Sequence, residues 1–406
     1  MAGLLLNLAA LLIAAFVGGL IVRRWGYPAV VGELLVGSVI GPYALGVVGD
    51  VEALRLFAEL GAIVLLFYIG LEVELTRFIR SLKGAFCVGV LPPLLGAVFV
   101  LLVSVGMGFT KLESLSLVAI VFPTSVAISA RVLRDMNKLH TKVGELVVGG
   151  AVVNDILGVI MASVVMEMSV ATLKPLTVVS LTFRAIVFLL IVLIIGSALI
   201  VRVLTSISIS PETLAVVMIA LAFAAAHFAE DVGLPTIIGA LAMGIALSGL
   251  GRAKKKTITY LQALYAFFVP IFFVSSGMMV DWRMFGSKAL LPSLALTAVL
   301  VAGSFVGCLI SAYIIKTSLS DTLRIGVAMM PRGETSLVIA SVMMARGLIG
   351  NVCYSISIIM ITLTTVVAPI MLKYMYKFEP HEIVGRFKLL LSRYALKVRE
   401  LRRERR

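Results

Sequence analysis

The segment PAVVGELLVG, residues 28–37, returns 207 residues later as PTIIGALAMG, residues 235–244. The proline and both glycines keep their places in the two copies. The same offset relates FYIGLEVE, residues 67–74, to VSSGMMVD, residues 274–281, which share a glycine, a valine and a terminal acidic residue. One such pair could arise by chance, but a series in a single register is typical of an internal duplication. We therefore predict that one structural unit occurs twice in this chain.

The composition excludes a water-soluble globule. Of the 406 residues, 61% are hydrophobic and only 14% are charged, whereas soluble domains carry about 25% charged residues. A formal net charge of +14 could suggest a nucleic-acid partner, but half of it falls in the last 34 residues. Short basic loops and a basic tail are expected of a membrane protein, so we predict no nucleic acid as partner and the lipid bilayer as surroundings.

Thirteen apolar segments are long enough for membrane helices, since a bilayer core of about 30 Å needs roughly 20 residues per helix. The first precedes Arg23 and Arg24 instead of following a basic region, so we interpret it as a retained span and not as a secretory signal. The fold class is thus an all-α polytopic membrane protein. The expected spans are residues 4–22, 28–46, 54–72, 84–106, 113–134, 143–167, 178–203, 211–229, 235–250, 258–280, 289–315, 322–346 and 350–372.

The loops between these spans predict an orientation. Assigned alternately to two faces, they place sixteen Lys and Arg on one face and seven on the other. We therefore expect a protein of the cell membrane whose amino end lies outside the cell and whose carboxyl end lies in the cytoplasm, as the positive-inside rule requires. Seven crossings separate each span from its repeat copy, so the copies face opposite ways. Inverted repeats are typical of secondary transporters.

We expect a transmembrane domain over residues 1–372 and a basic cytoplasmic tail over 373–406. Within the domain, repeat one covers about 1–170, a linking helix 178–203, and repeat two 211–372. The tail carries apolar residues at helical spacing between arginines, which suits either a helix along the anionic inner leaflet or a disordered basic end.

One acidic residue lies at the expected centre of the membrane. Asp155 is twelve residues from both limits of span 143–167, roughly 18 Å from either end. A charged side chain there costs on the order of 2.5 to 3.5 kcal/mol, so it needs a function or a partner. We interpret Asp155 as the site of proton and cation binding; pairing with a basic residue of another helix is the structural alternative.

Two spans carry proline near mid-depth, in VFPTSVAIS around Pro123 and in MMPRGETSLVIAS around Pro331, 208 residues apart. Proline removes a helix hydrogen bond and clashes with the preceding turn, so each helix should kink or break. Interrupted helices at matching places in two repeats indicate a transport site. Freed carbonyls and the hydroxyls of Thr124 and Ser125 are ligands that suit a small hard cation.

Charged and polar neighbours complete the candidate site. Arg332 and Glu334 are two residues apart and do not share a helix face, so Arg332 should bond outside its own span, to Asn154 or to the carbonyl end of a broken helix. Glu334 is either a second proton site or a structural partner. Glu33 lies near a span end, where a snorkelling or capping role is expected.

These motifs, taken in order, resemble the monovalent cation:proton antiporters, in particular the branch with NapA-type and Kef-type exchangers. The resemblance implies the sodium/proton antiporter fold with crossed discontinuous helices, homodimers, no cofactor, and exchange of sodium, lithium or potassium for protons in pH homeostasis. It covers about residues 1–372 and rests on VGELLVGSVIGP, LFYIGLEVEL, FPTSVAIS, VVNDILGVI, GLPTIIGALAMGIALS, PIFFVSSGMMVDW and PRGETSLVIAS.

The resemblance maps the family's ion site onto Asp155, Thr124 and Ser125. Many members have two adjacent aspartates, whereas this chain has Asn154 before Asp155, a pattern typical of electroneutral exchangers. In such relatives an arginine of the interrupted twelfth helix, matching Arg332, holds the asparagine. Kef-type members also carry a soluble nucleotide-binding domain, and without one we expect no ligand gating of that kind.

A single carboxylate can hold a proton or a dehydrated cation but hardly both, so competition at Asp155 would couple the two fluxes. With one exchanging acid we predict electroneutral exchange. A sodium-coupled organic-anion symporter shares such an architecture and is the first alternative; it would need a roomy substrate cavity. An intramembrane aspartyl protease is a second, but it needs two catalytic carboxylates, and Asp155 has no clear aspartate partner.

Overall fold

The computed structural model describes residues 2–48, 51–169, 175–207, 209–281, 283 and 287–377, and over them the regular secondary structure is helix, without a strand. The expected tail, apart from its first five residues, lies outside the described residues. The helices are α1 Ala2–Arg24, α2 Ala29–Ile40, α3 Val51–Glu72, α4 Leu75–Gly106, α5 Lys111–Val121, α6 Val126–Asp135, α7 Lys142–Ser169, α8 Pro175–Ile195, the π-helical turn η1 Gly196–Ile200, α9 Val201–Ser206, α10 Pro211–Asp231, α11 Thr236–Leu247, the 3₁₀ turn η2 Ser248–Leu250, α12 Arg252–Met278, α13 Ser287–Ile315, α14 Leu319–Ala328, α15 Glu334–Ala345 and α16 Asn351–Lys377.

Helix occupies each of the thirteen expected ranges. Within the described residues, ten helical segments are long and apolar enough to cross a membrane. Three shorter apolar helices, α2, α11 with its 3₁₀ turn, and α15, fall below that length. The all-helical membrane class is thus confirmed, while the count of thirteen crossings stays a prediction.

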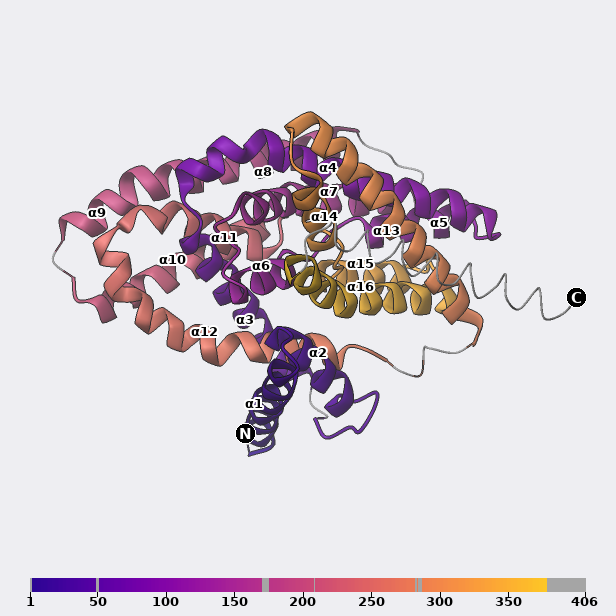
Figure 1. The fold of residues 1–406 in the computed structure, drawn as a ribbon, viewed down its shortest axis with the longest axis horizontal. Helices are drawn as coiled ribbons and strands as arrows, with labels where there is room; N and C mark the ends of the chain where they lie inside the picture. Colours follow the sequence, from indigo (N-terminus) through magenta and orange to yellow (C-terminus); the bar gives the residue numbers. More distant parts are fainter. Residues whose placement is uncertain are drawn as a thin grey trace, which may run out of the picture.

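The helices gather into two bundles, which lie on opposite sides of Figure 1. In the first bundle α3 packs on α11 and α12, and α2 packs on α1 and α12. In the second, the long α4 packs against α13 and α7, and α16 lies along α13. The broken helices α5–α6 and α14–α15 belong to the second bundle, and α8 runs between α7 and α11.

Reciprocal contacts confirm the duplication that the glycine register predicted. Gly37 of α2 lies against the backbone of Val274 in α12, so close that a Cβ on Gly37 would strike its carbonyl. Gly244 of α11 lies in the same way against the carbonyl of Phe67 in α3. Adding 207 to Gly37 gives Gly244, and subtracting it from Val274 gives Phe67. Each contact thus has an equivalent in which the two repeats exchange roles. Two units related by a two-fold axis produce such pairs of contacts.

Local sequence at the two broken helices is duplicated as well. Thr110 caps α5: its hydroxyl accepts a bond from the Glu113 N–H at 3.2 Å, and the Glu113 carboxylate accepts a bond from the Thr110 N–H at 3.0 Å. Ser318, 208 residues later, caps α14 by accepting from the Asp321 N–H at 3.1 Å. Such caps satisfy donors that a helix start leaves free, so both broken helices begin at fixed, equivalent residues.

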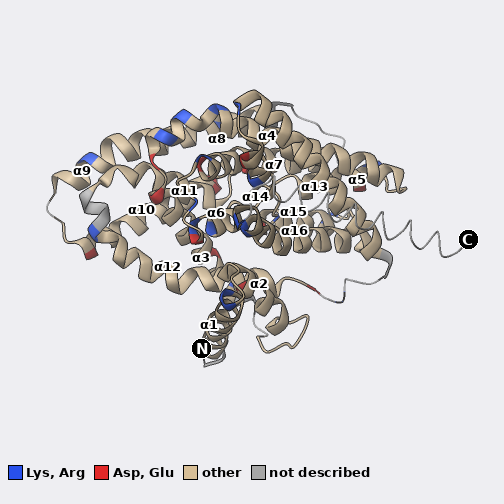
Figure 2. Ribbon diagram, viewed as in Figure 1, with Lys and Arg blue, Asp and Glu red and all other residues tan. Residues whose placement is uncertain are grey.

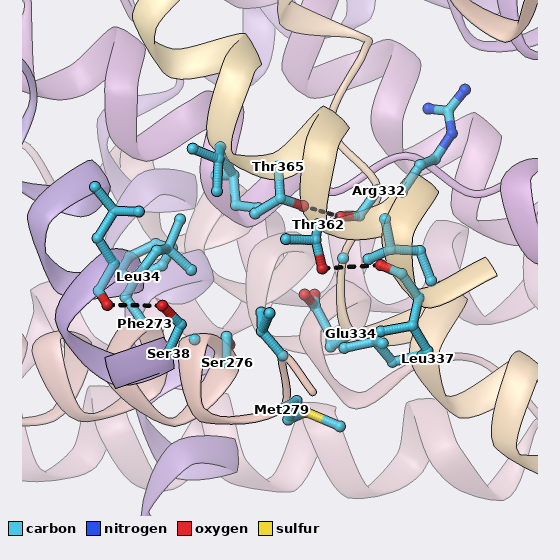
Figure 3. Close-up of a pocket in the computed structure, with 18 of the residues that line it drawn as sticks. Leu34, Ser38, Phe273, Ser276, Met279, Arg332, Glu334, Leu337, Thr362 and Thr365 are labelled. Atoms are coloured by element: carbon cyan, nitrogen blue, oxygen red, sulfur yellow. Dashed lines mark hydrogen bonds between the residues drawn. The ribbon is translucent and has the colours of Figure 1, made fainter. Parts of the chain in front are cut away.

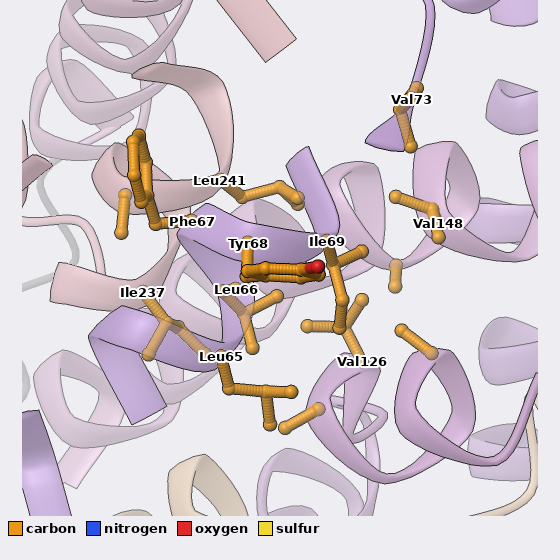
Figure 4. Close-up of a cluster of buried hydrophobic side chains, with 14 of the residues drawn as sticks. Leu65, Leu66, Phe67, Tyr68, Ile69, Val73, Val126, Val148, Ile237 and Leu241 are labelled. Carbon is orange, nitrogen blue, oxygen red and sulfur yellow. The ribbon is translucent and has the colours of Figure 1, made fainter. Parts of the chain in front are cut away.

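The main apolar core lies around α3, at the junction of the two bundles. Figure 4 shows side chains of α3 with Ile237 and Leu241 of α11 on one side and Val126 of α6 with Val148 of α7 on the other. All of them are buried. Because lipid tails are as apolar as these side chains, close packing of small residues and polar contacts must position the bundles.

Candidate functional site

Both prolines interrupt their helices, as predicted. Helix α5 ends at Val121 and α6 begins at Val126, so Pro123 lies in a non-helical link. Helix α14 ends at Ala328 and α15 begins at Glu334, with Pro331 in the link between them. The missing N–H and the ring of each proline account for the interruptions.

The two links cross each other and are joined by hydrogen bonds. The Ser125 N–H donates to the carbonyl of Pro331 at 2.8 Å. In the reverse direction, the Ser336 hydroxyl donates to the carbonyl of Pro123 at 3.3 Å. The Ser129 hydroxyl of α6 also donates to the Ala328 carbonyl, at the end of α14. Backbone groups that the breaks release are therefore satisfied by the opposite repeat.

A helix beside each break satisfies the remaining backbone groups. Asn154 of α7 accepts from the Thr124 N–H at 2.5 Å and donates to the Phe122 carbonyl at 3.2 Å. In the second repeat, Thr364 of α16 accepts from the Arg332 N–H at 3.3 Å. The residue after each proline is thus held by a polar side chain of the neighbouring helix, and both chain segments keep a fixed, open shape.

Asp155 is buried beside this crossing, with 1% of its surface exposed. It follows Asn154 in α7, and Gly158 one turn later packs directly on Pro123. Among the described residues, Asp155 Oδ1, Thr124 Oγ1 and Ser125 Oγ are buried oxygens without a hydrogen bond. The three predicted cation ligands therefore keep oxygens free, although buried oxygens are ordinarily paired.

The crossing also brings four helix ends together. The amino ends of α6 and α15 and the carboxyl ends of α5 and α14 adjoin the two links. Helix amino ends carry partial positive charge and carboxyl ends partial negative charge. Two of each nearly cancel, so the helix ends by themselves favour neither a cation nor an anion.

Arg332 lies fully buried at the second link, and its Nη1 donates to the Met329 carbonyl at 3.0 Å. Met329 follows the carbonyl end of α14, but it belongs to the same expected span as Arg332, so this bond is not the predicted bond outside that span. The expected bond to Asn154 is not among the hydrogen bonds of the described residues, and both polar atoms of Asn154 bond the first link instead. Arg332 Nε and Nη2 are buried without partners.

Glu334 begins α15 and lines a narrow cavity between the two bundles. Figure 3 shows its carboxylate turned into this cavity, below Thr362 and opposite Ser276 and Met279. The cavity has a volume of ≈ 50 Å³ and reaches Arg332 and Gly333 at the crossing. Asp155 and Glu334 are close enough to interact electrostatically. Glu334 thus lies both at the start of α15 beside the crossing and in the wall of this cavity.

A second, wider cavity lies between the bundles on the basic face, the face of Arg23 and Arg134. Its volume is ≈ 410 Å³, and its walls include Glu33, Arg131 and Tyr265. Glu33, expected to snorkel or to cap a span end, is instead buried and lies 3.8 Å from Arg131. Arg131, inside the expected span 113–134, is buried in α6 and was missed as a candidate functional residue. Its charge inside an expected span was the available signal.

Comparison with known proteins agrees with this arrangement. The family model described as "Sodium/hydrogen exchanger, transmembrane" matches residues 11–377. The chain is 33% identical to the Na(+)/H(+) antiporter of Enterococcus hirae, covering 91% of this chain and 97% of that protein. It is 32% identical to the Na(+)/H(+)-K(+) antiporter GerN of Bacillus cereus, with 91% and 95% covered.

A solved structure shows the same fold. The sodium proton antiporter MjNhaP1 from Methanocaldococcus jannaschii superimposes with a TM-score of 0.71 over 91% of this chain and 96% of its own, at 17% identity. The antiporter fold with crossed interrupted helices is therefore confirmed. Given the family match along nearly all of the described residues, the chain belongs to the sodium/hydrogen exchanger family and is a membrane transporter, not an enzyme.

Proposed function

We propose that this transporter exchanges a monovalent cation for a proton at Asp155, with Na⁺ as the main cation and Li⁺ or K⁺ as further candidates. The observation that carries the proposal is the buried Asp155 carboxylate with a free oxygen beside two free hydroxyls at the crossing. A carboxylate and neutral oxygens are the ligands that a dehydrated hard cation prefers. The names of the Enterococcus and Bacillus relatives supply the substrates.

Competition for one carboxylate provides the coupling. When Asp155 is ionised, it can hold a cation together with Thr124 and Ser125; when it is protonated, the cation loses its charged ligand. An empty ionised carboxylate is costly to move through a low-dielectric interior, because neither water nor a counter-ion neutralises it. Only the protonated form and the cation-bound form should therefore change between the outward-facing and inward-facing conformations. One proton is then exchanged for one monovalent cation, without net movement of charge.

Alternating access would connect the crossing to one face at a time. The Glu334 cavity reaches the crossing at Arg332 and Gly333, whereas the walls of the basic-face cavity include Arg131 and Arg134 at the other end of α6. The two cavities differ in size, ≈ 50 Å³ against ≈ 410 Å³, so the bundles are closer on one side than on the other. A relative movement of the bundles would exchange the narrow and wide sides, as in other transporters built from repeats.

The proposal includes an orientation and an assembly. With the basic face in the cytoplasm, the wide cavity opens inward and the Glu334 cavity outward, in agreement with the positive-inside rule. Two copies form a homodimer in the membrane. Protease protection of a tag at each end in sealed vesicles tests the orientation, and native mass spectrometry of the purified protein tests the dimer.

Proteoliposomes test the exchange itself. Purified protein is reconstituted with a pH gradient, and dissipation of the gradient is followed after adding Na⁺, Li⁺ or K⁺ in turn. We expect rapid dissipation with Na⁺ and none with choline chloride. Asp155→Asn should abolish the response while the protein keeps its elution volume and helical content. Full activity in this variant would remove Asp155 from the mechanism.

A further inference from the structure

Helix α6 links the crossing to the other bundle. At its amino end, Ser125 is bonded to Pro331 and Ser129 to the carbonyl of Ala328. At its carboxyl end it carries Arg131 and Arg134, three residues apart and so on one face of the helix. Figure 2 shows blue and red segments meeting around α6, amid helices that are mostly uncharged.

Arg134 is held by the first bundle through three contacts. Its Nε donates to Glu72 at the end of α3, at 3.0 Å. Its guanidinium also lies 4.5 Å from the ring centroid of Tyr68 and 4.4 Å from that of Tyr265 in α12. Cation–π contacts of this kind strengthen when water is excluded, and both ion-pair side chains are only 21% exposed.

Arg131 is held less completely. Its guanidinium stacks 5.0 Å from the Tyr265 centroid, and its Nη2 lies 3.8 Å from Glu33 in α2. Asp135, on the same helix, bonds its Nε at 3.0 Å. Glu33 Oε2 and Arg131 Nη1 are buried without a hydrogen bond. The Arg131–Glu33 contact is therefore only partly formed, unlike the close Arg134–Glu72 pair.

Packing alone does not explain this arrangement. Buried ion pairs contribute little net stability, and apolar residues of similar volume often stabilise a protein more. The guanidinium groups also line the wide cavity through which we propose that a cation passes, where free positive charge would repel it. Arg134 is neutralised by Glu72 of the opposite bundle, and Arg131 by Asp135 of its own helix together with Glu33 of the opposite bundle. Charged contacts between two bundles that move against each other can select one relative position.

We propose that Arg131 and Arg134, together with Glu33, Glu72, Tyr68 and Tyr265, form an interbundle clamp that stabilises the conformation open to the basic face. The inference rests on the proposed alternating access. Close ion pairs and cation–π contacts act over a few Å, so a shift of α6 by one helical turn, about 5.4 Å, would break them. Release of the clamp would accompany opening of the Glu334 cavity.

If the clamp acts in this way, weakening it should shift the equilibrium between the two conformations while the residues of the ion site stay unchanged. The probes are two cysteines, Ala266→Cys in the wall of the basic-face cavity and Met279→Cys in the wall of the Glu334 cavity. Each is placed in a chain whose three native cysteines are replaced by serine or alanine. Labelling by a membrane-impermeant maleimide is measured in nanodiscs, where both faces of the protein are accessible.

Glu72→Gln should raise the labelling rate at position 279 and lower it at position 266, changing their ratio about tenfold, the effect typical of one partly buried charge pair. Glu74→Gln is the matched control. It removes the same charge two residues away, from an exposed pair with Arg77 at 2.9 Å that does not join the bundles. The control should leave the ratio within about twofold of the parent.

A double variant that exchanges the two charges distinguishes loss of the ion pair from misfolding of the protein. In Glu72→Arg/Arg134→Glu the ion pair is restored with reversed polarity, but the cation–π contacts with Tyr68 and Tyr265 are lost, so the ratio of labelling rates should return only part of the way to that of the parent. Unchanged ratios in both Glu72→Gln and Arg134→Gln would overturn the clamp. If those ratios stay unchanged while Asp155→Asn still abolishes exchange, the clamp fails and the proposed exchange at Asp155 stands.

Discussion

The backbone N–H of Ser125 donates to the carbonyl of Pro331 at 2.8 Å, although 206 residues separate them in the chain. This bond ties the break of one repeat to the break of the other. Because the carbonyls of Phe122, Pro123 and Pro331 are engaged in such bonds, few backbone oxygens remain for a cation. In the proposed exchange, the hydroxyls of Thr124 and Ser125 would supply the main neutral ligands of the cation.

Removing one neutral ligand should weaken cation binding more than turnover. Thr124→Val and Ser125→Ala each delete an unpaired hydroxyl at the crossing. We expect an increase in the apparent KM for Na⁺ of about tenfold, which corresponds to ~1.4 kcal/mol, and a smaller change in maximal rate. Sodium titrations of pH-gradient dissipation measure both.

Ser116→Ala is the control for these variants. Ser116 is a buried serine of α5 that also lacks a hydrogen-bond partner, but it lies outside the link. Its KM should equal that of the parent. A similar rise in KM for Ser116→Ala would mean that loss of any buried hydroxyl disturbs the bundle, and that the two link residues are not ligands.

Exchange should be independent of membrane voltage. One proton against one monovalent cation moves no net charge, so an imposed potential of about 100 mV should alter the rate by less than about twofold. Movement of one full charge would add about 2.3 kcal/mol, up to about fifty-fold in rate. Initial rates at several valinomycin-set potentials measure this, with choline as counter-cation, and a steep dependence contradicts electroneutral exchange.

Asn154→Ala should destabilise the protein. It leaves the Thr124 N–H and the Phe122 carbonyl buried without partners, and each unsatisfied group costs about 1 to 3 kcal/mol. We expect a lower midpoint of thermal unfolding in detergent. Ser163→Ala, which removes a hydroxyl bonded only within α7, should unfold close to the parent temperature.

The reciprocal packing predicts equal sensitivity at equivalent glycines. A Cβ on Gly277 would strike the Leu34 carbonyl, and one on Gly70 would strike the Leu241 carbonyl. Because backbone cannot yield easily, Gly70→Ala and Gly277→Ala should each destabilise by about 1 to 3 kcal/mol. Gly106→Ala, with open space around its Cβ position, should be nearly neutral. Thermal unfolding of the three variants provides the comparison.

The sequence alone predicted the helical class, the two copies and the places of both breaks. Composition and the length of the apolar segments require membrane helices, and proline interrupts a helix whatever surrounds it. Asp155 became the candidate ion-binding residue for a similar reason, since a carboxylate at mid-depth is costly in any membrane fold. These features follow from local chemistry and the properties of the bilayer, so no tertiary contact was needed to infer them.

Only the tertiary structure decided which groups meet. Arg332 has several carbonyls and amides within possible reach, and the crossing assigns it to Met329 while Asn154 holds the first link. Arg131 lies near the end of the expected span 113–134, and folding buries it against Glu33 and Tyr265 of the other bundle. A long, flexible charged side chain can reach many different ion-pair and hydrogen-bond partners. Which partner they take depends on how two distant repeats pack, and no local pattern encodes that.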